Sequence, residues 1–137
     1  MKFLPFVFSV FLMVPAMAIP GRVGYIIDGD TFSCAVKIDE DIEISARVRI
    51  RNVDTPEIHG DCEYERNMAQ RAKERLGQII PSGTMVDLTN IKDDKYLGRI
   101  DANVTDAKGR DVGNVLIQEG LGRGYSGGRR KPWCSLK

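Results

Sequence analysis

Apolar and polar residues alternate along several segments of this chain, and the clearest alternation lies between residues 42 and 53. Alternate residues of this segment would face opposite sides of a strand, so one face is apolar and the other polar. The two sets are Ile42, Ile44, Ala46, Val48 and Ile50, and Glu43, Ser45, Arg47, Arg49 and Arg51. Further strands are predicted at 21–27, 31–38, 84–88 and 99–104, with a tight Asp28-Gly29-Asp30 turn after the first.

Two segments carry helical periodicity instead. Residues 62–80 place Met68, Ala72, Leu76 and Ile80 at i, i+4 spacing, and Pro81 ends the pattern. A second helix is predicted after Asp111, a suitable cap, with Gly120 at its end. The order of three strands, helix, two strands and helix predicts a mainly β α+β fold. The closest match is a five-stranded OB-type barrel with two or three packed helices.

The first 18 of the 137 residues are typical of a secretory signal peptide. Lys2 is followed by an apolar stretch at 3–14, and Ala16-Met17-Ala18 fits the small-x-small cleavage rule. An uncleaved anchor is the alternative. Cleavage would leave residues 19–137 as a single domain, secreted or periplasmic, and without stable membrane association. We expect a monomer.

The formal net charge is only +1, so bulk electrostatic attraction cannot explain binding to nucleic acid. The charges are nevertheless segregated. Residues 39–41 are all acidic and predict a solvated turn, whereas Arg129-Arg130-Lys131 forms a basic run near the C-terminus. Such a run is most often solvated surface, but it could also help to hold a polyanion.

Three cysteines are present, and export to an oxidising compartment would favour a disulfide. Cys62 and Cys134 both lie in polar, loop-like segments, and their bond would fix a short C-terminal tail. Cys34 lies in a strand-like segment and is interpreted as a buried thiol. The odd count leaves the pairing open.

Two acidic positions point to a cation site. Asp30 follows a glycine turn and Asp54 ends a strand, so both can lie at one rim of a barrel. Two carboxylates with a backbone carbonyl and water would form an oxygen-only site suited to Ca²⁺ or Mg²⁺. Each motif alone is equally typical of an ordinary turn.

Other polar residues near these positions suit phosphate chemistry. Arg49 and Arg99 can bind phosphate through two hydrogen bonds each, although a solvated sheet face would also explain arginines on a strand. Glu57 could deprotonate an attacking water, or it could be a surface residue. His59 is interpreted as a loop residue rather than a base. Tyr125 could stack on a base or pack at the barrel rim.

Taken in order, these segments resemble the staphylococcal nuclease (thermonuclease) family over nearly all of residues 19–137. The matching segments are Asp28-Gly29-Asp30-Thr31, Arg49 through Val53-Asp54-Thr55-Pro56-Glu57, Asp94-Lys95-Tyr96-Leu97-Gly98-Arg99, and Glu119-Gly120-Leu121 followed by Tyr125. As an ordered set they are far more specific than any one of them.

The resemblance implies a secreted Ca²⁺-dependent endonuclease that cleaves DNA and RNA with little sequence preference and leaves 3′-phosphate ends. It also implies a role for each matching residue. Asp30, Asp54 and the Thr55 carbonyl would hold Ca²⁺, and Glu57 would act as general base or position the water. Arg49 and Arg99 would bind the scissile phosphate, and Lys95, Tyr96 and Tyr125 would belong to the nucleotide pocket.

The chain departs from the type member of that family in three places. In the type member, tyrosine, glycine and arginine follow one another directly, whereas here Leu97 stands between Tyr96 and Gly98. The spacing from Leu121 to Tyr125 is also slightly shorter than in the type member. The chain also ends soon after Cys134, without the long C-terminal helix. We expect a Cys62–Cys134 disulfide to replace some of that support.

Two other function classes fit parts of the pattern. A non-catalytic OB-fold module could bind nucleic acid without cutting it. A calcium-stabilised structural domain would explain the carboxylates but not the arginines. Only the nuclease requires Asp30, Asp54, Glu57, Arg49 and Arg99 together.

Overall fold

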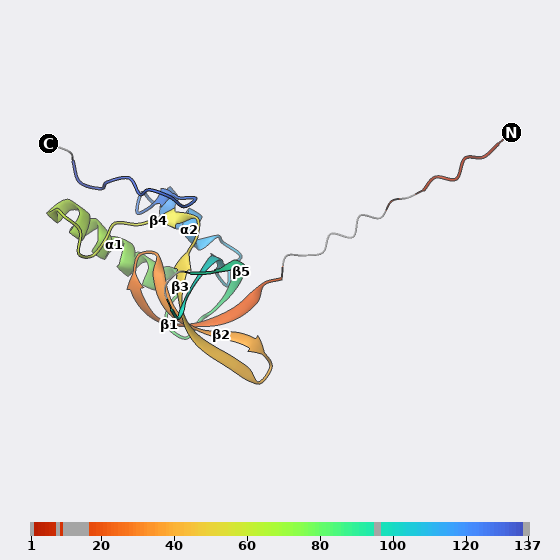
Figure 1. The fold of residues 1–137 in the computed structure, drawn as a ribbon, viewed down its shortest axis with the longest axis horizontal. Helices are drawn as coiled ribbons and strands as arrows, with labels where there is room; N and C mark the ends of the chain where they lie inside the picture. The colour runs from red at the N-terminus through yellow and green to blue at the C-terminus, as the bar shows by residue number, and fades with distance from the viewer. Residues whose placement is uncertain (1, 8, 10–16, 95–96, 136–137) are drawn as a thin grey trace.

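The computed structural model describes residues 2–7, 9, 17–94 and 97–135. Figure 1 shows the chain, in which seven strands and two helices are described. They are β1 (Ile19–Asp28), β2 (Thr31–Asp39), β3 (Ile42–Ile50), β4 (Val53–Asp54), α1 (Glu63–Ile79), β5 (Met85–Asp93), β6 (Arg99–Thr105), α2 (Val112–Gln118) and β7 (Arg123–Gly124). Residues 2–7 are exposed and belong to no helix or strand.

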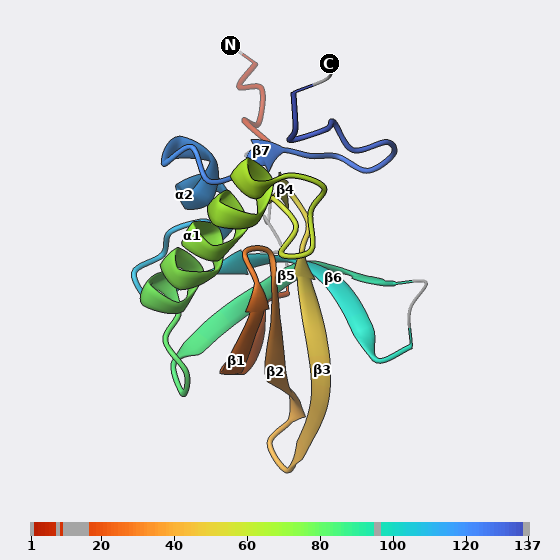
Figure 2. The same ribbon diagram turned by 90° about the vertical axis from the view of Figure 1, so that its left-hand side faces the viewer.

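Five strands close into a barrel in the order β1-β2-β3-β6-β5. β3 and β6 are parallel, and the other neighbouring pairs are antiparallel. Figure 2 shows both helices on the same side of the barrel, with β4 and β7 at its upper end. The predicted α+β fold with an OB-type barrel is therefore confirmed.

Buried apolar residues of the strands and both helices pack in a shared core, which includes Phe32, Ile50 and Leu116. Helix α1 contributes Ala72 and Leu76 at the predicted spacing, and both are fully buried. Helix α2 begins as predicted, because the Asp111 side chain accepts a hydrogen bond from an amide of its first turn. The helices therefore cover one side of the barrel and support the segments at its upper end.

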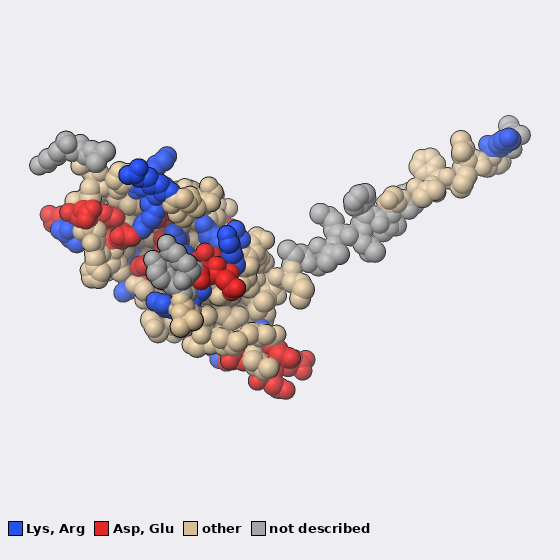
Figure 3. Space-filling view, in the orientation of Figure 1, with Lys and Arg blue, Asp and Glu red and all other residues tan. Residues whose placement is uncertain are grey.

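The apolar face of β3 is shorter than its alternation predicts. Val48 and Ile50 are buried, but Ile42 and Ile44 are 52% and 48% exposed. The β2–β3 hairpin projects beyond the other strands, so these two side chains have no barrel interior to face (Figure 2). Its turn carries the predicted acidic cluster, which forms the red tip in Figure 3.

The strand predicted to run to residue 53 ends instead at Ile50. A turn at 51–52 interrupts it, and Val53–Asp54 becomes a separate short strand paired with β7. Asn52 fixes this turn, because its side chain donates to Asp111 at 3.0 Å and its carbonyl accepts from the Tyr125 amide at 3.1 Å. The turn thereby joins the end of β3 to both α2 and β7.

The segment after β7 returns to the start of α1, where a disulfide joins Cys62 to Cys134 across 72 positions of sequence. Cys34 lies in the barrel core with 3% exposure, and this burial raises the pKa of its thiol to about 11. In the described part of the chain, neither helix has the length and apolar character needed to cross a membrane.

Candidate active site

One open cleft of about 1110 Å³ lies at the end of the barrel that carries β4 and β7. Most of the predicted site residues line it: Asp30, Arg49, Thr55, Glu57, Arg99 and Tyr125. Asp54 does not line the cleft itself but lies behind it, next to Thr55, with 2% of its surface exposed. Lys95 and Tyr96 lie outside the described residues.

The turn between β1 and β2 holds Asp30 against the segment that follows β4. Asp30 Oδ2 accepts a hydrogen bond from the Thr55 amide at 3.0 Å, and Oδ1 accepts one from Thr31 Oγ1 at 3.2 Å. Gly29 permits this approach, because a Cβ there would lie 2.7 Å from Ala72 and 2.8 Å from Thr55 Oγ1. Asp30 is consequently buried and fixed in direction.

A second carboxylate, Asp28, accompanies Asp30 in this turn and accepts a hydrogen bond from its amide at 3.0 Å. Burial, followed by the nearby charge of Asp30, raises the pKa of Asp28 to about 7. Burial also raises the pKa of Asp54, and Arg130 opposes that rise. Buried carboxylates with perturbed pKa values are typical of functional sites.

Asp54 and Thr55 provide further oxygens close to Asp30. Among the described residues, none donates a hydrogen bond of normal geometry to the buried Oδ1 of Asp54. Trp133 Nε1 donates to its Oδ2 at 3.3 Å. Two nearby carboxylates and a backbone carbonyl match the oxygen ligands that Ca²⁺ prefers.

The chemistry of these donors therefore fits the predicted cation. Within the described residues, no three His, Cys, Asp or Glu side chains gather closely enough to hold a metal by themselves. A cation at this place would depend on Asp30, Asp54, the Thr55 carbonyl and water. Such a mixed, all-oxygen set is suited to Ca²⁺ rather than to zinc.

Arg49 and Arg99 come from the neighbouring parallel strands β3 and β6. Arg49 Nη1 donates to the carbonyls of Ile50 at 2.5 Å and Val53 at 2.8 Å, and it lies 3.4 Å from Asp30 Oδ2. Arg99 Nε is paired with Asp94 Oδ2 at 2.8 Å. Both guanidinium groups are thus held at the cleft wall, on the face of the sheet away from the core.

Glu57 lies on the loop that leads from β4 to α1, and its side chain is 57% exposed. The buried side chain of Glu65, in the first turn of α1, accepts a hydrogen bond from the Glu57 amide at 3.1 Å and one from the Asp61 amide at 3.4 Å. His59, on the same loop, is exposed. The loop is therefore shaped by a buried carboxylate that sequence reasoning did not identify.

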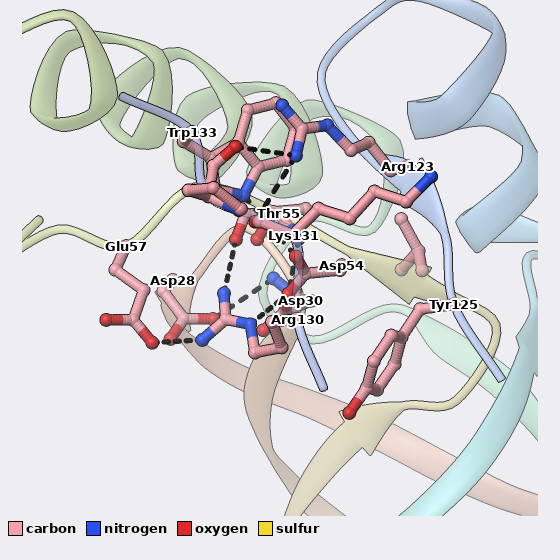
Figure 4. A network of polar contacts seen from close by, with 12 residues as sticks. Asp28, Asp30, Asp54, Thr55, Glu57, Arg123, Tyr125, Arg130, Lys131 and Trp133 are labelled. Carbon is pink, nitrogen blue, oxygen red and sulfur yellow. Dashed lines mark hydrogen bonds and ion pairs between the residues drawn. The ribbon is translucent and has the colours of Figure 1, made fainter. Parts of the chain in front are cut away.

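Tyr125 follows β7 and stands beside Arg49. The guanidinium carbon of Arg49 lies 5.8 Å from the centre of its ring, and its hydroxyl donates to the Gly128 carbonyl at 2.6 Å. The ring forms part of the cleft wall, as Figure 4 shows.

Arg130 is the second residue that the sequence did not reveal. Its guanidinium pairs with Asp54 Oδ1 at 2.6 Å through Nε, donates to the Thr55 carbonyl at 3.0 Å, and contacts the Glu57 carboxylate (Figure 4). The interpretation of the 129–131 run as purely solvated surface does not describe this residue, because it pairs with the buried carboxylate of Asp54 and the exposed one of Glu57. Its interpretation as a polyanion-binding residue stays a prediction. No local pattern signals a contact 76 positions away.

Comparison with known proteins agrees with the geometry. The family described as staphylococcal nuclease homologue matches residues 47–132, which are more than half of the chain. The matched segment includes Arg49, Asp54, Thr55, Glu57 and Arg99, while Asp30 precedes it. No curated protein matches the chain. By its sequence and its barrel, the chain belongs to the staphylococcal nuclease homologue family.

Proposed function

We propose that this chain is a secreted, Ca²⁺-dependent endonuclease that hydrolyses DNA and RNA with little sequence specificity and leaves 3′-phosphate ends. One observation carries the proposal. Two buried carboxylates, an exposed glutamate and two arginines from separate segments meet at one cleft. A binding module has no need of this combination, whereas hydrolysis of a phosphodiester uses each part of it.

Asp30, Asp54 and the Thr55 carbonyl are the groups that would hold the cation. Bound Ca²⁺ would neutralise phosphate charge and help to position the attacking water. The direction of Asp30 is fixed by the Thr55 amide and Thr31, so two of the ligand groups would be held in place before substrate arrives.

The remaining residues would act on the substrate. Glu57 would accept a proton from the water that attacks phosphorus, and the bond to the 5′ oxygen would break, leaving phosphate on the 3′ side. Arg49 and Arg99 would bind the non-bridging oxygens, on which negative charge increases in the transition state. Their contacts with Asp30 and Asp94 would have to rearrange to admit the phosphate.

Recognition in this proposal depends mainly on the phosphate backbone, which explains low sequence specificity. Lys95, Tyr96 and Tyr125 would add contacts to the nucleotide, and Tyr125 already lines the cleft. Affinity for both nucleic acids should fall as salt rises. Residues 1–18 would direct export, and the single domain at 19–137 would act as a monomer outside the cytoplasm.

Cleavage of a plasmid and of a single-stranded RNA tests the proposal. The mature protein is incubated with each substrate in Ca²⁺, in Mg²⁺ and with chelator, beside Glu57→Gln and the matched control Glu63→Gln. Glu63 is an exposed residue of α1. We expect degradation of both substrates only with Ca²⁺, loss of about 10²-fold or more in Glu57→Gln, and little change in the control.

The ends of the products test the remaining detail. Fragments with a 3′-phosphate are not extended by a polymerase until a phosphatase has removed it. Binding without cleavage under every metal condition would instead favour a non-catalytic OB-fold module.

A further inference from the structure

The position of Arg130 bears directly on the cation site. Its guanidinium contacts Asp54, the Thr55 carbonyl and Glu57, which are two proposed cation ligands and the proposed base. Figure 4 shows it inserted among these groups, with Asp30 beside them. A divalent cation that uses the oxygens of Asp54 and Thr55 would compete for them with a guanidinium 2.6 and 3.0 Å away, because two positive charges so close together repel each other.

The charge at Asp54 explains why an arginine is stable there. The Asp54 side chain is 2% exposed, so its negative charge needs a close positive partner. Arg130 Nε lies 2.6 Å from Asp54 Oδ1, whereas Arg49 Nη2 lies 3.9 Å from the same oxygen. Arg130 is therefore the closer counter-ion of this buried carboxylate.

The chain holds Arg130 at this place from both sides. On one side, Arg123 of β7 donates to the carbonyls of Lys131 at 3.3 Å and Pro132 at 3.0 Å, and its guanidinium stacks on the Trp133 ring at 3.6 Å. On the same side, Cys134 is bonded to Cys62 next to α1. On the other side, before Arg130, the Gly128 carbonyl accepts a hydrogen bond from the Tyr125 hydroxyl at 2.6 Å. Because the segment is anchored before and after Arg130, its guanidinium stays close to Asp54 at a high effective concentration.

We propose that Arg130 is the built-in counter-ion of the cation site, and that a divalent cation binds only by displacing its guanidinium. Arg130 thereby sets the affinity of the site for the cation. It also releases Glu57 in the same step, because one guanidinium holds both Asp54 and Glu57. This inference rests on the proposed function, since it takes Asp54 and Thr55 as ligands.

Calorimetric titration with calcium chloride, in the absence of nucleic acid, tests the inference. Wild type is compared with Arg130→Gln and with Arg129→Gln, which removes the same charge from an exposed neighbouring position. We expect Arg130→Gln to bind Ca²⁺ at least about tenfold more tightly, because the cation no longer replaces charge-assisted contacts. Arg129→Gln should bind Ca²⁺ nearly as wild type does.

A second measurement uses the wild-type protein and does not depend on a variant that folds. The side-chain Nε–H signal of Arg130 is followed by NMR in arginine-labelled protein while calcium is added. We expect this signal to shift in step with the calorimetric saturation. A signal that stays unchanged at saturation would overturn the inference.

The outcomes separate this inference from the proposed function. Equal or weaker Ca²⁺ binding in Arg130→Gln, with wild type still binding, overturns the inference alone. If no variant binds Ca²⁺, the inference falls together with the calcium dependence of the proposed nuclease. Equal tightening in both variants would mean that general charge sets the affinity, and that also overturns it.

Discussion

Replacing Glu65 by alanine should destabilise the protein and disorganise the loop that carries Glu57. The Glu65 side chain is buried where α1 begins, and the loop wraps closely around it. A Cβ at Gly60 would lie only 2.4 Å from the Glu65 carboxyl carbon. Alanine would leave two amides that now point at the carboxylate, those of Glu57 and Asp61, without their acceptor.

The magnitude follows from these two contacts. A hydrogen bond to a charged group contributes about 1.5–3 kcal/mol, and the Asp61 contact, at 3.4 Å, should contribute about half of that. Both Glu63 and Glu65 lie in the first turn of α1, where a negative charge adds about 0.3–1 kcal/mol through the helix dipole. The dipole contribution cancels in the comparison, so Glu65→Ala should cost about 2–4.5 kcal/mol more than Glu63→Ala.

Thermal unfolding of the two variants and of Glu65→Gln measures this difference. For a domain of this size the expected cost corresponds to a midpoint about 8–18 °C lower in Glu65→Ala than in Glu63→Ala. Glu65→Gln keeps one acceptor oxygen and should lie between them. If Glu65→Ala and Glu63→Ala unfold at the same temperature, the carboxylate does not organise the loop and the reasoning is refuted.

Three other perturbations have defined outcomes. Reduction of the Cys62–Cys134 bond should lower the free energy of unfolding by up to ~4 kcal/mol, because the bond closes a loop of 72 positions; an unchanged midpoint would count against a structural role. Burial alone would raise the pKa of Asp106, but hydrogen bonds from Arg110 and the neighbouring amides outweigh it and lower that pKa. Its stabilisation is thus present above about pH 4 and lost as pH falls through the folded pKa, so Asp106→Asn should flatten the acid limb of a stability–pH curve; an identical limb would contradict this. Gly29→Ala should destabilise the folded protein by about 1–3 kcal/mol, because the added carbon would lie 2.7 Å from Ala72 of α1. If calorimetry finds the same unfolding temperature as for wild type, the turn relaxes freely and the prediction is wrong.

Local patterns were sufficient to predict the barrel strands and both helices, whereas the candidate residues at the cleft came mainly from the family resemblance. Alternation and caps report on neighbours in sequence, and Asp30, Asp54 and Arg49 each lie at or beside the end of a strand. The same patterns do not say where a barrel stops. Ile42 and Ile44 therefore continue an apolar alternation into a hairpin that projects beyond the core.

The contacts of the C-terminal tail could not be predicted in this way. Strands β4 and β7 have two residues each, too few for any periodicity, and their pairing decides the path of the tail. Arg130 reaches Asp54 only because of that path, and within the sequence it is one of three adjacent basic residues. Glu65 resembles any other acidic residue of an amphipathic helix until the loop before it is seen to close around it.

The third cysteine has a consequence for how this chain acquires its disulfide. A free thiol beside a disulfide can exchange with it, and only the thiolate form attacks. Once the barrel has closed, Cys34 is 3% exposed with a thiol pKa of about 11, so it is both inaccessible and protonated at neutral pH. Mispairing is therefore confined to the unfolded chain, and the closing of the barrel makes the choice of partners final.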